Sequence, residues 1–144
     1  MNHDPFELGL HDLNNAGVYA IGNGDVGPLS AAMRDAGLRV LQVDLDGCHD
    51  KRTLLKRLGT QLDFPSTFGG NWDALQDCLG DLQWLRSPGG YAVFLSDADA
   101  LRNDAGADFD TLLDVLDEAS KAWAKDDVPF WAFVALKDVE TSDP

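Results

Sequence analysis

The segment of residues 68–82 constrains the fold of this chain more than any other stretch, because it joins a glycine turn to a strongly periodic helix pattern. Gly69 and Gly70 allow a tight turn, and the side-chain oxygen of Asn71 can accept a hydrogen bond from the free N–H groups of a first helical turn. At about 100° per residue, the positions that follow fall on two faces. The apolar face holds Trp72, Leu75, Leu79 and Leu82, and the acidic face holds Asp73, Asp77 and Asp81. The sequence therefore predicts a helix that begins after Asn71 and buries one side only.

Folding alone does not call for the acidic face. Its three aspartates stand four residues apart and repel one another by about a few tenths of a kcal/mol per neighbouring pair. The helix dipole favours Asp73 in the first turn, whereas Asp81 lies too far along the helix to benefit. Two interpretations follow: the aspartates form a solvated face of an acidic protein, or they bind a cationic partner.

The order of residues in this segment resembles the signature of the barstar family, whose members are intracellular inhibitors of barnase-type ribonucleases. The matching run reads Phe68-Gly69-Gly70-Asn71-Trp72-Asp73-Ala74-Leu75-Gln76-Asp77-Cys78-Leu79. It keeps the aromatic residue, the glycine, the cap, both aspartates and the cysteine at one fixed spacing. The resemblance extends over about residues 38–136, and it implies a protein that plugs the active site of a ribonuclease.

The resemblance also implies which residues contact the ribonuclease. Asp77 would occupy a phosphate position in the active site and accept charge-assisted hydrogen bonds from arginine. Asp73 would pair with a basic residue beside that position. Asn71 and Gly70 would support the contact made by the backbone.

Four further positions complete the implied interface. A looser alignment of a later helix places Asp110 and Asp114 at the family's second acidic contact. Thr67 and Gln76 stand where barstar presents a tyrosine and a tryptophan, and such aromatic residues usually supply much of the energy of an interface. The implied partner is therefore a basic ribonuclease of the barnase type, and the two replacements leave a ribonuclease other than barnase, or another basic toxin, open as the target.

The charge balance of the chain agrees with a basic protein partner. The 144 residues carry 25 acidic and 11 basic side chains, for a net charge of −14. Such a charge repels the phosphate backbone of nucleic acids and anionic membrane surfaces, and it attracts basic proteins. A surface adapted to high salt would give the same balance. We expect a protein partner, no direct contact with nucleic acid or membrane, and a monomer when the chain is free.

Strand and helix patterns alternate along the chain. Apolar runs predict strands at residues 18–21, 38–45, 91–95 and 130–136, and amphipathic patterns predict helices at residues 28–36, 51–62, 72–82 and 108–124. The alternation predicts an α/β fold with a small parallel sheet of about four strands and helices packed on it. We expect one compact domain, in which residues 1–37 form a lead-in and an added βα unit, residues 38–137 the barstar-like part and residues 138–144 a tail. The added strand is expected at one edge of the sheet, in a right-handed βαβ unit with parallel strands.

The run Gly22-Asn23-Gly24-Asp25-Val26-Gly27 supports an alternative function, because it fits the dinucleotide-binding pattern G-x-G-x-x-G between a strand and a helix. Asp44, at the end of the next strand, would be the acidic residue that binds the ribose. Against this, Pro28 removes a helix-start donor and Asp25 places a carboxylate where pyrophosphate would lie. Dinucleotide binding through Gly22, Gly24 and Gly27 is the alternative to ribonuclease inhibition. An acidic interaction domain with a partner that is not a ribonuclease is the second alternative.

The cysteines and histidines predict neither catalysis nor a metal site. Cys48 and Cys78 have no disulfide or metal spacing, and we expect buried or half-buried thiols. The three histidines are His3, His11 and His49. They form no pattern typical of a catalytic triad or a metal site, so we expect a protein that is not an enzyme and has no cofactor and no metal.

Two other charged groups have two interpretations each. The helix at residues 51–62 carries a basic outer face, which consists of Lys51, Arg52, Lys56 and Arg57. This face can bind an anion or be solvated. Asp97 and Asp99 follow the strand at residues 91–95, where they can bind a cation or serve as loop and helix-capping residues.

The sequence also indicates where the protein works. No apolar run is long enough to cross a bilayer, and the first residues lack a basic region followed by an apolar one. We therefore expect a cytoplasmic protein, as suits an antitoxin or immunity-like inhibitor.

Overall fold

The computed structural model describes residues 15–65, 68–82 and 89–139. Its elements in chain order are β1 (Val18–Gly22), the 3-10 turn η1 (Asn23–Asp25), α1 (Val26–Asp35), β2 (Arg39–Asp44), α2 (Lys51–Gln61), α3 (Trp72–Asp81), β3 (Tyr91–Ser96), α4 (Asp99–Asp104), α5 (Gly106–Lys125) and β4 (Phe130–Leu136). The predicted α/β class is confirmed. Thr67, His3, His11, the first residues of the lead-in and the end of the tail lie outside the described ranges.

The four strands form one parallel sheet in the order β1-β4-β3-β2. β1 lies at an edge, as expected. The two strands of the predicted βαβ unit, β1 and β2, are not neighbours in the sheet, because β4 and β3 lie between them. The burial of the strands explains this order. All seven residues of β4 and five of the six in β3 are buried. Each of these strands therefore needs a strand on either side of it and helices on both faces of the sheet. β1 and β2 have exposed positions and take the edges.

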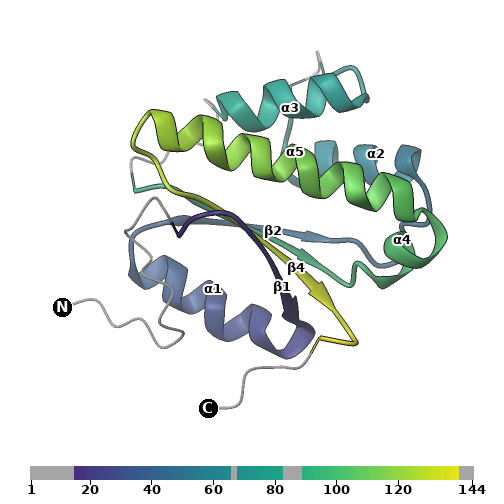
Figure 1. Ribbon diagram of the computed structural model, residues 1–144, viewed down its shortest axis with the longest axis horizontal. Helices are drawn as coiled ribbons and strands as arrows, with labels where there is room; N and C mark the ends of the chain where they lie inside the picture. Colours follow the sequence, from purple (N-terminus) through teal and green to yellow (C-terminus); the bar gives the residue numbers. More distant parts are fainter. Residues whose placement is uncertain (1–14, 66–67, 83–88, 140–144) are drawn as a thin grey trace.

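Helices cover the two faces of the sheet unequally (Figure 1). α1 covers one face, where Met33 packs with Phe94 and Phe133. α2 and α5 cover the other face, and α3 packs against α5 as an outer layer. The core on that face includes leucines of all three helices. These are Leu54, Leu55, Leu58, Leu75, Leu79, Leu112 and Leu116. α3 is therefore held by its apolar face, with its other face turned outward.

Two helices differ from the sequence prediction. α1 begins at Val26 and not at Pro28, because the first-turn N–H groups of a helix have no partner within the helix, so proline is tolerated there. α4 was not predicted: it has six residues and buries only Leu101, which is too little for a periodic pattern. Across the three described ranges, no helix is both long enough and apolar enough to span a membrane.

Candidate functional site

The N-terminus of α3 has the geometry that the sequence predicts. The side-chain oxygen Oδ1 of Asn71 accepts a hydrogen bond from the backbone N–H of Ala74 at 2.8 Å. Gly70, just before the cap, has φ +70°, a left-handed conformation that side chains disfavour. The glycine and the asparagine together fix the direction in which the helix starts.

The two faces of α3 are separated as predicted. Leu75, Leu79 and Leu82 are at most 1% exposed, whereas the three aspartates of the acidic face are exposed. The side chains of Asp73, Asp77 and Asp81 form no ion pair or hydrogen bond with any other residue that the structure describes. Asp73 and Asp77 lie about one helical turn apart, about 6 Å along the axis, so one pocket of a partner can receive both.

The C-terminal end of α3 is anchored to α5 by a residue that the sequence analysis did not single out. Nε1 of Trp123 donates a hydrogen bond to the backbone carbonyl of Leu79 at 2.7 Å. That carbonyl is one of the last four of the helix, which have no partner within the helix. The ring of Trp123 also packs on Tyr91, with 5.2 Å between the ring centroids. A tryptophan on the buried side of a long amphipathic helix was the only sequence signal for this role.

The remaining implied contact residues are placed less uniformly. Gln76 is half-buried on α3, about 60° around the helix from Asp73, so it flanks the acidic face. Asp110 and Asp114 are exposed on α5. They lie about 200° and 240° around that helix from Asp108, which lines a pocket together with Gly70. Their role as the second acidic contact of the implied interface stays a prediction.

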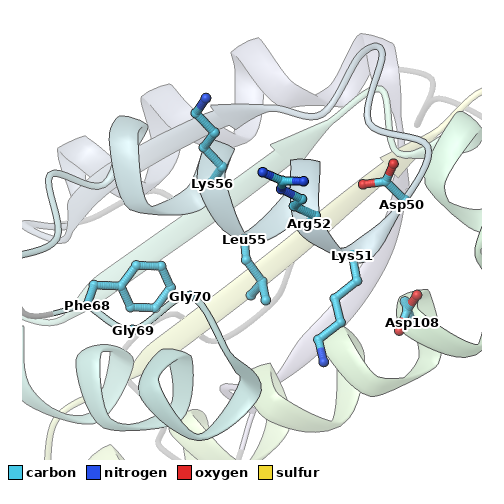
Figure 2. A pocket seen from close by; sticks show the side chains of 9 residues that line it. All are labelled: Asp50, Lys51, Arg52, Leu55, Lys56, Phe68, Gly69, Gly70 and Asp108. Carbon is cyan, nitrogen blue, oxygen red and sulfur yellow. The ribbon is translucent and has the colours of Figure 1, made fainter.

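A pocket of about 690 Å³ lies between the N-terminal ends of α2 and α3 (Figure 2). Its lining includes Lys51, Arg52 and Lys56 of α2, and also Phe68, Gly70 and Asp108. The fourth basic residue of α2 points elsewhere, because Arg57 donates hydrogen bonds to the backbone carbonyls of Asp44 at 2.6 Å and Asp46 at 3.1 Å. The predicted basic face thus splits into a pocket wall and one structural arginine.

The geometry argues against the dinucleotide interpretation of the glycine run. Asp25 is 4% exposed and immediately precedes α1, so a carboxylate is buried at the helix start where a phosphate would have to approach. Asp44 ends β2, which is three strand spacings, about 14 Å, from β1. An acidic residue at that distance is poorly placed for a ribose bound at the end of β1.

One of the two aspartates that follow β3 has a structural role. Asp99 accepts a hydrogen bond from the backbone N–H of Lys137 at 2.9 Å, which ties the end of β4 to α4. Within the described part of the chain, no group of three or more histidine, cysteine or acidic side chains could hold a metal ion. Cys48 is buried and Cys78 half-buried, as predicted, and burial raises the pKa of both thiols.

Comparison with known proteins adds a fold likeness and a family. No curated protein matches the sequence. The ORC2 protein of Aeropyrum pernix, solved as ADPNP-ADP complexes, is similar with a TM-score of 0.52 and 20% identity, covering 83% of this chain and 34% of that chain. Drosophila ORC bound to DNA is similar with a TM-score of 0.51 and 14% identity, covering 85% of this chain and 32% of that chain. This chain spans only those fractions of their lengths, and identity this low shows a shared fold alone.

The family match falls on the part of the chain that carries the capped acidic helix. The model of the family Barstar (barnase inhibitor) matches residues 38–135, which run from just before β2 into β4 and contain α3 and α5. β1 and α1 precede the match. With most of its length matched, and with Asn71 and the two aspartates of the signature in the geometry described above, the chain belongs to the barstar family.

Proposed function

We propose that this protein binds and inhibits a ribonuclease of the barnase type by placing the acidic face of α3 in the cationic active site of the enzyme. The observation that carries the proposal is that Asp73 and Asp77 are exposed without an ion-pair partner among the described residues. Both are exposed on one face of a helix that is capped at its start and anchored to α5 near its end, and neither forms an ion pair with another described residue. Two unpaired carboxylates on a rigid support are suited to bind arginine and lysine.

The chemistry of the target explains why carboxylates would inhibit it. A ribonuclease must bind RNA phosphate and stabilise the negative charge that develops during cleavage, so its active site gathers cationic side chains. The carboxylate of Asp77 would take the position of a phosphate and accept hydrogen bonds from arginine. Asp73, one turn earlier, would bind a second basic residue. No reaction on this chain is needed, so we propose a binding protein and not an enzyme.

The charge of the whole chain supports the same partner class. A net charge of −14 speeds encounter with a basic ribonuclease and disfavours direct contact with RNA. We propose that the protein acts in the cytoplasm as an antitoxin or immunity protein, protecting cellular RNA. Gln76 supplies no large aromatic contact, which favours a target other than barnase itself.

The test is inhibition of RNA cleavage by a panel of basic ribonucleases that includes barnase, with lysozyme as a basic protein that is not a ribonuclease. We expect a stable complex with at least one ribonuclease, weakened by added salt. Asp77→Ala should weaken this complex at least about thirtyfold, the loss of about 2 kcal/mol that marks a dominant interface residue.

The matched control is Asp35→Ala, which removes the same charge from an exposed position on α1, at the opposite face of the sheet. It should leave the affinity within about twofold, because an exposed charge outside the interface contributes little. The proposal is wrong if no ribonuclease of the panel is inhibited, or if both variants weaken the complex equally. Binding to lysozyme as strong as to any ribonuclease would favour a general acidic interaction domain.

A further inference from the structure

The pocket between α2 and α3 has a charge opposite to that of the protein around it. In a chain of net charge −14, its wall carries Lys51, Arg52 and Lys56. One of its two acidic residues, Asp50, is already used, since it caps α2 by accepting a hydrogen bond from the N–H of Thr53 at 2.8 Å. The pocket is therefore a cationic site on an acidic molecule.

The basic side chains of this pocket are available for an external ligand. Arg52 and Lys56 are exposed and form no hydrogen bond or ion pair with any other residue in the described ranges. Lys51 lies 5.5 Å from the centroid of the Trp72 ring, which holds its ammonium group near the start of α3. By contrast, Arg102 and Lys121 elsewhere in the chain are paired with Asp138 and Asp117.

The base of the pocket is apolar. Leu55 is buried, and Phe68 packs edge-on against Phe64, with 4.9 Å between the ring centroids. Figure 2 shows the basic side chains on α2, with Arg52 and Lys56 pointing to one side of the helix and Lys51 to the other, and with Phe68 and the two glycines beside the helix. An apolar base below basic side chains suits a ligand that has a hydrocarbon stem and an anionic end.

The pocket adjoins the start of α3. Gly70 lines the pocket and is followed at once by Asn71 and, two residues later, by Asp73. A protein that covers the first turn of α3 would therefore also cover the mouth of the pocket. The surface offered to such a partner is acidic along α3 and basic beside its N-terminus.

We propose that this pocket receives an acidic side chain, glutamate or aspartate, of the ribonuclease, so that the partner is recognised through both signs of charge. This inference rests on the proposed function. The net charge of the chain repels free polyanions, whereas a carboxylate carried by a basic protein is delivered by the attraction between the two proteins. A ribonuclease without an acidic group at this place would leave Arg52 and Lys56 desolvated and unpaired, so the pocket selects among basic ribonucleases.

The test uses the sign of a charge change. The variant Arg52→Glu/Lys56→Glu makes the chain more negative, and general attraction to a basic ribonuclease then predicts equal or tighter binding. The proposal predicts the opposite, at least about tenfold weaker binding to the ribonuclease inhibited by the wild type. The matched control is Arg34→Glu/Arg39→Glu, which makes the same charge change at exposed residues of α1 and β2, and it should bind equally or more tightly.

A scan of the ribonuclease identifies the acidic group. Replacing the correct Glu or Asp of the enzyme by Ala should weaken binding to the wild type about tenfold and leave binding to Arg52→Glu/Lys56→Glu unchanged or improved. If the wild type binds a ribonuclease and both double variants bind alike, the pocket assignment is wrong while the inhibitor proposal stands. If inorganic phosphate competes with the complex and no carboxylate couples to Arg52, the pocket is a phosphate site and the assignment is likewise wrong. If the wild type binds no ribonuclease, the function and the pocket assignment fail together.

Discussion

The hydrogen bond from Trp123 to Leu79 offers the sharpest test of the claim that α3 is a fixed support for its aspartates. In Trp123→Phe the aromatic ring and its packing against Tyr91 are largely kept, but the carbonyl of Leu79 loses its donor. Leaving a buried acceptor without a partner costs about 1–3 kcal/mol. Because the hydrogen bond of Trp123 is only part-buried, water can partly replace it. We therefore expect the free energy of unfolding to fall by about 1–2 kcal/mol, in the lower part of that range.

The loss is measured by urea denaturation and by thermal melting, where it should lower the midpoint by about 2–8 °C for a chain of this size. Amide hydrogen exchange in α3 should accelerate, since the anchor at its C-terminal end is gone. The affinity for the ribonuclease should also fall, because part of the binding energy would then be used to order the helix.

Trp131→Phe is the matched control, since it makes the same chemical change without breaking a hydrogen bond. Nε1 of Trp131 is buried and has no hydrogen-bond partner among the described residues. A buried N–H without a partner destabilises the folded state by about 1–3 kcal/mol, and the variant removes this N–H. That gain offsets the loss of about 1 kcal/mol of packing free energy caused by the smaller ring. We expect Trp131→Phe to be neutral or slightly stabilising. Equal stability of the wild type and Trp123→Phe, or equal losses in both variants, would refute the anchoring argument.

Two further predictions concern the backbone at the start of α3 and the dependence of stability on pH below neutrality. Gly70→Ala should destabilise the protein by about 1–2 kcal/mol in urea denaturation, because φ is +70° there while the space around the position is open; Gly27→Ala, at a glycine with the same open space and ordinary φ, should cost less. The hydrogen bond from Arg102 lowers the pKa of Asp138, so this carboxylate adds stability at neutral pH that is lost as the pH falls below about 4. Asp138→Asn should therefore be less stable than the wild type at pH 7 and approach it below pH 4, and a difference that grows toward low pH would contradict this.

Local features of the chain were predictable because their causes lie within a few residues. The caps at Asp50 and Asn71 depend on a side chain and an N–H group three residues later, and both are present. The split of α3 into buried leucines and exposed aspartates follows from the helical period alone. The barstar signature is likewise a local pattern, so the family was recognisable before the fold was known.

Features that join distant segments were predicted poorly. β1 and β2 are consecutive in the chain but lie at opposite edges of the sheet, since the two most buried strands take the centre. Asp108 of α5 lines the pocket beside the start of α3, which the sequence did not predict, because the rotation of α5 about its axis is set by packing. Thr67 is not among the described residues, so its implied contact stays a prediction.

The sequence by itself determined that one helix would carry a row of aspartates away from an apolar core, because helical periodicity and capping act between neighbours along the chain. Only the tertiary structure decided that Trp123 anchors this helix and that a basic pocket opens beside its first turn. Both features join residues more than 10 positions apart in sequence, 44 in the case of Trp123 and Leu79, and the distances between these residues are set by how the helices pack on the sheet.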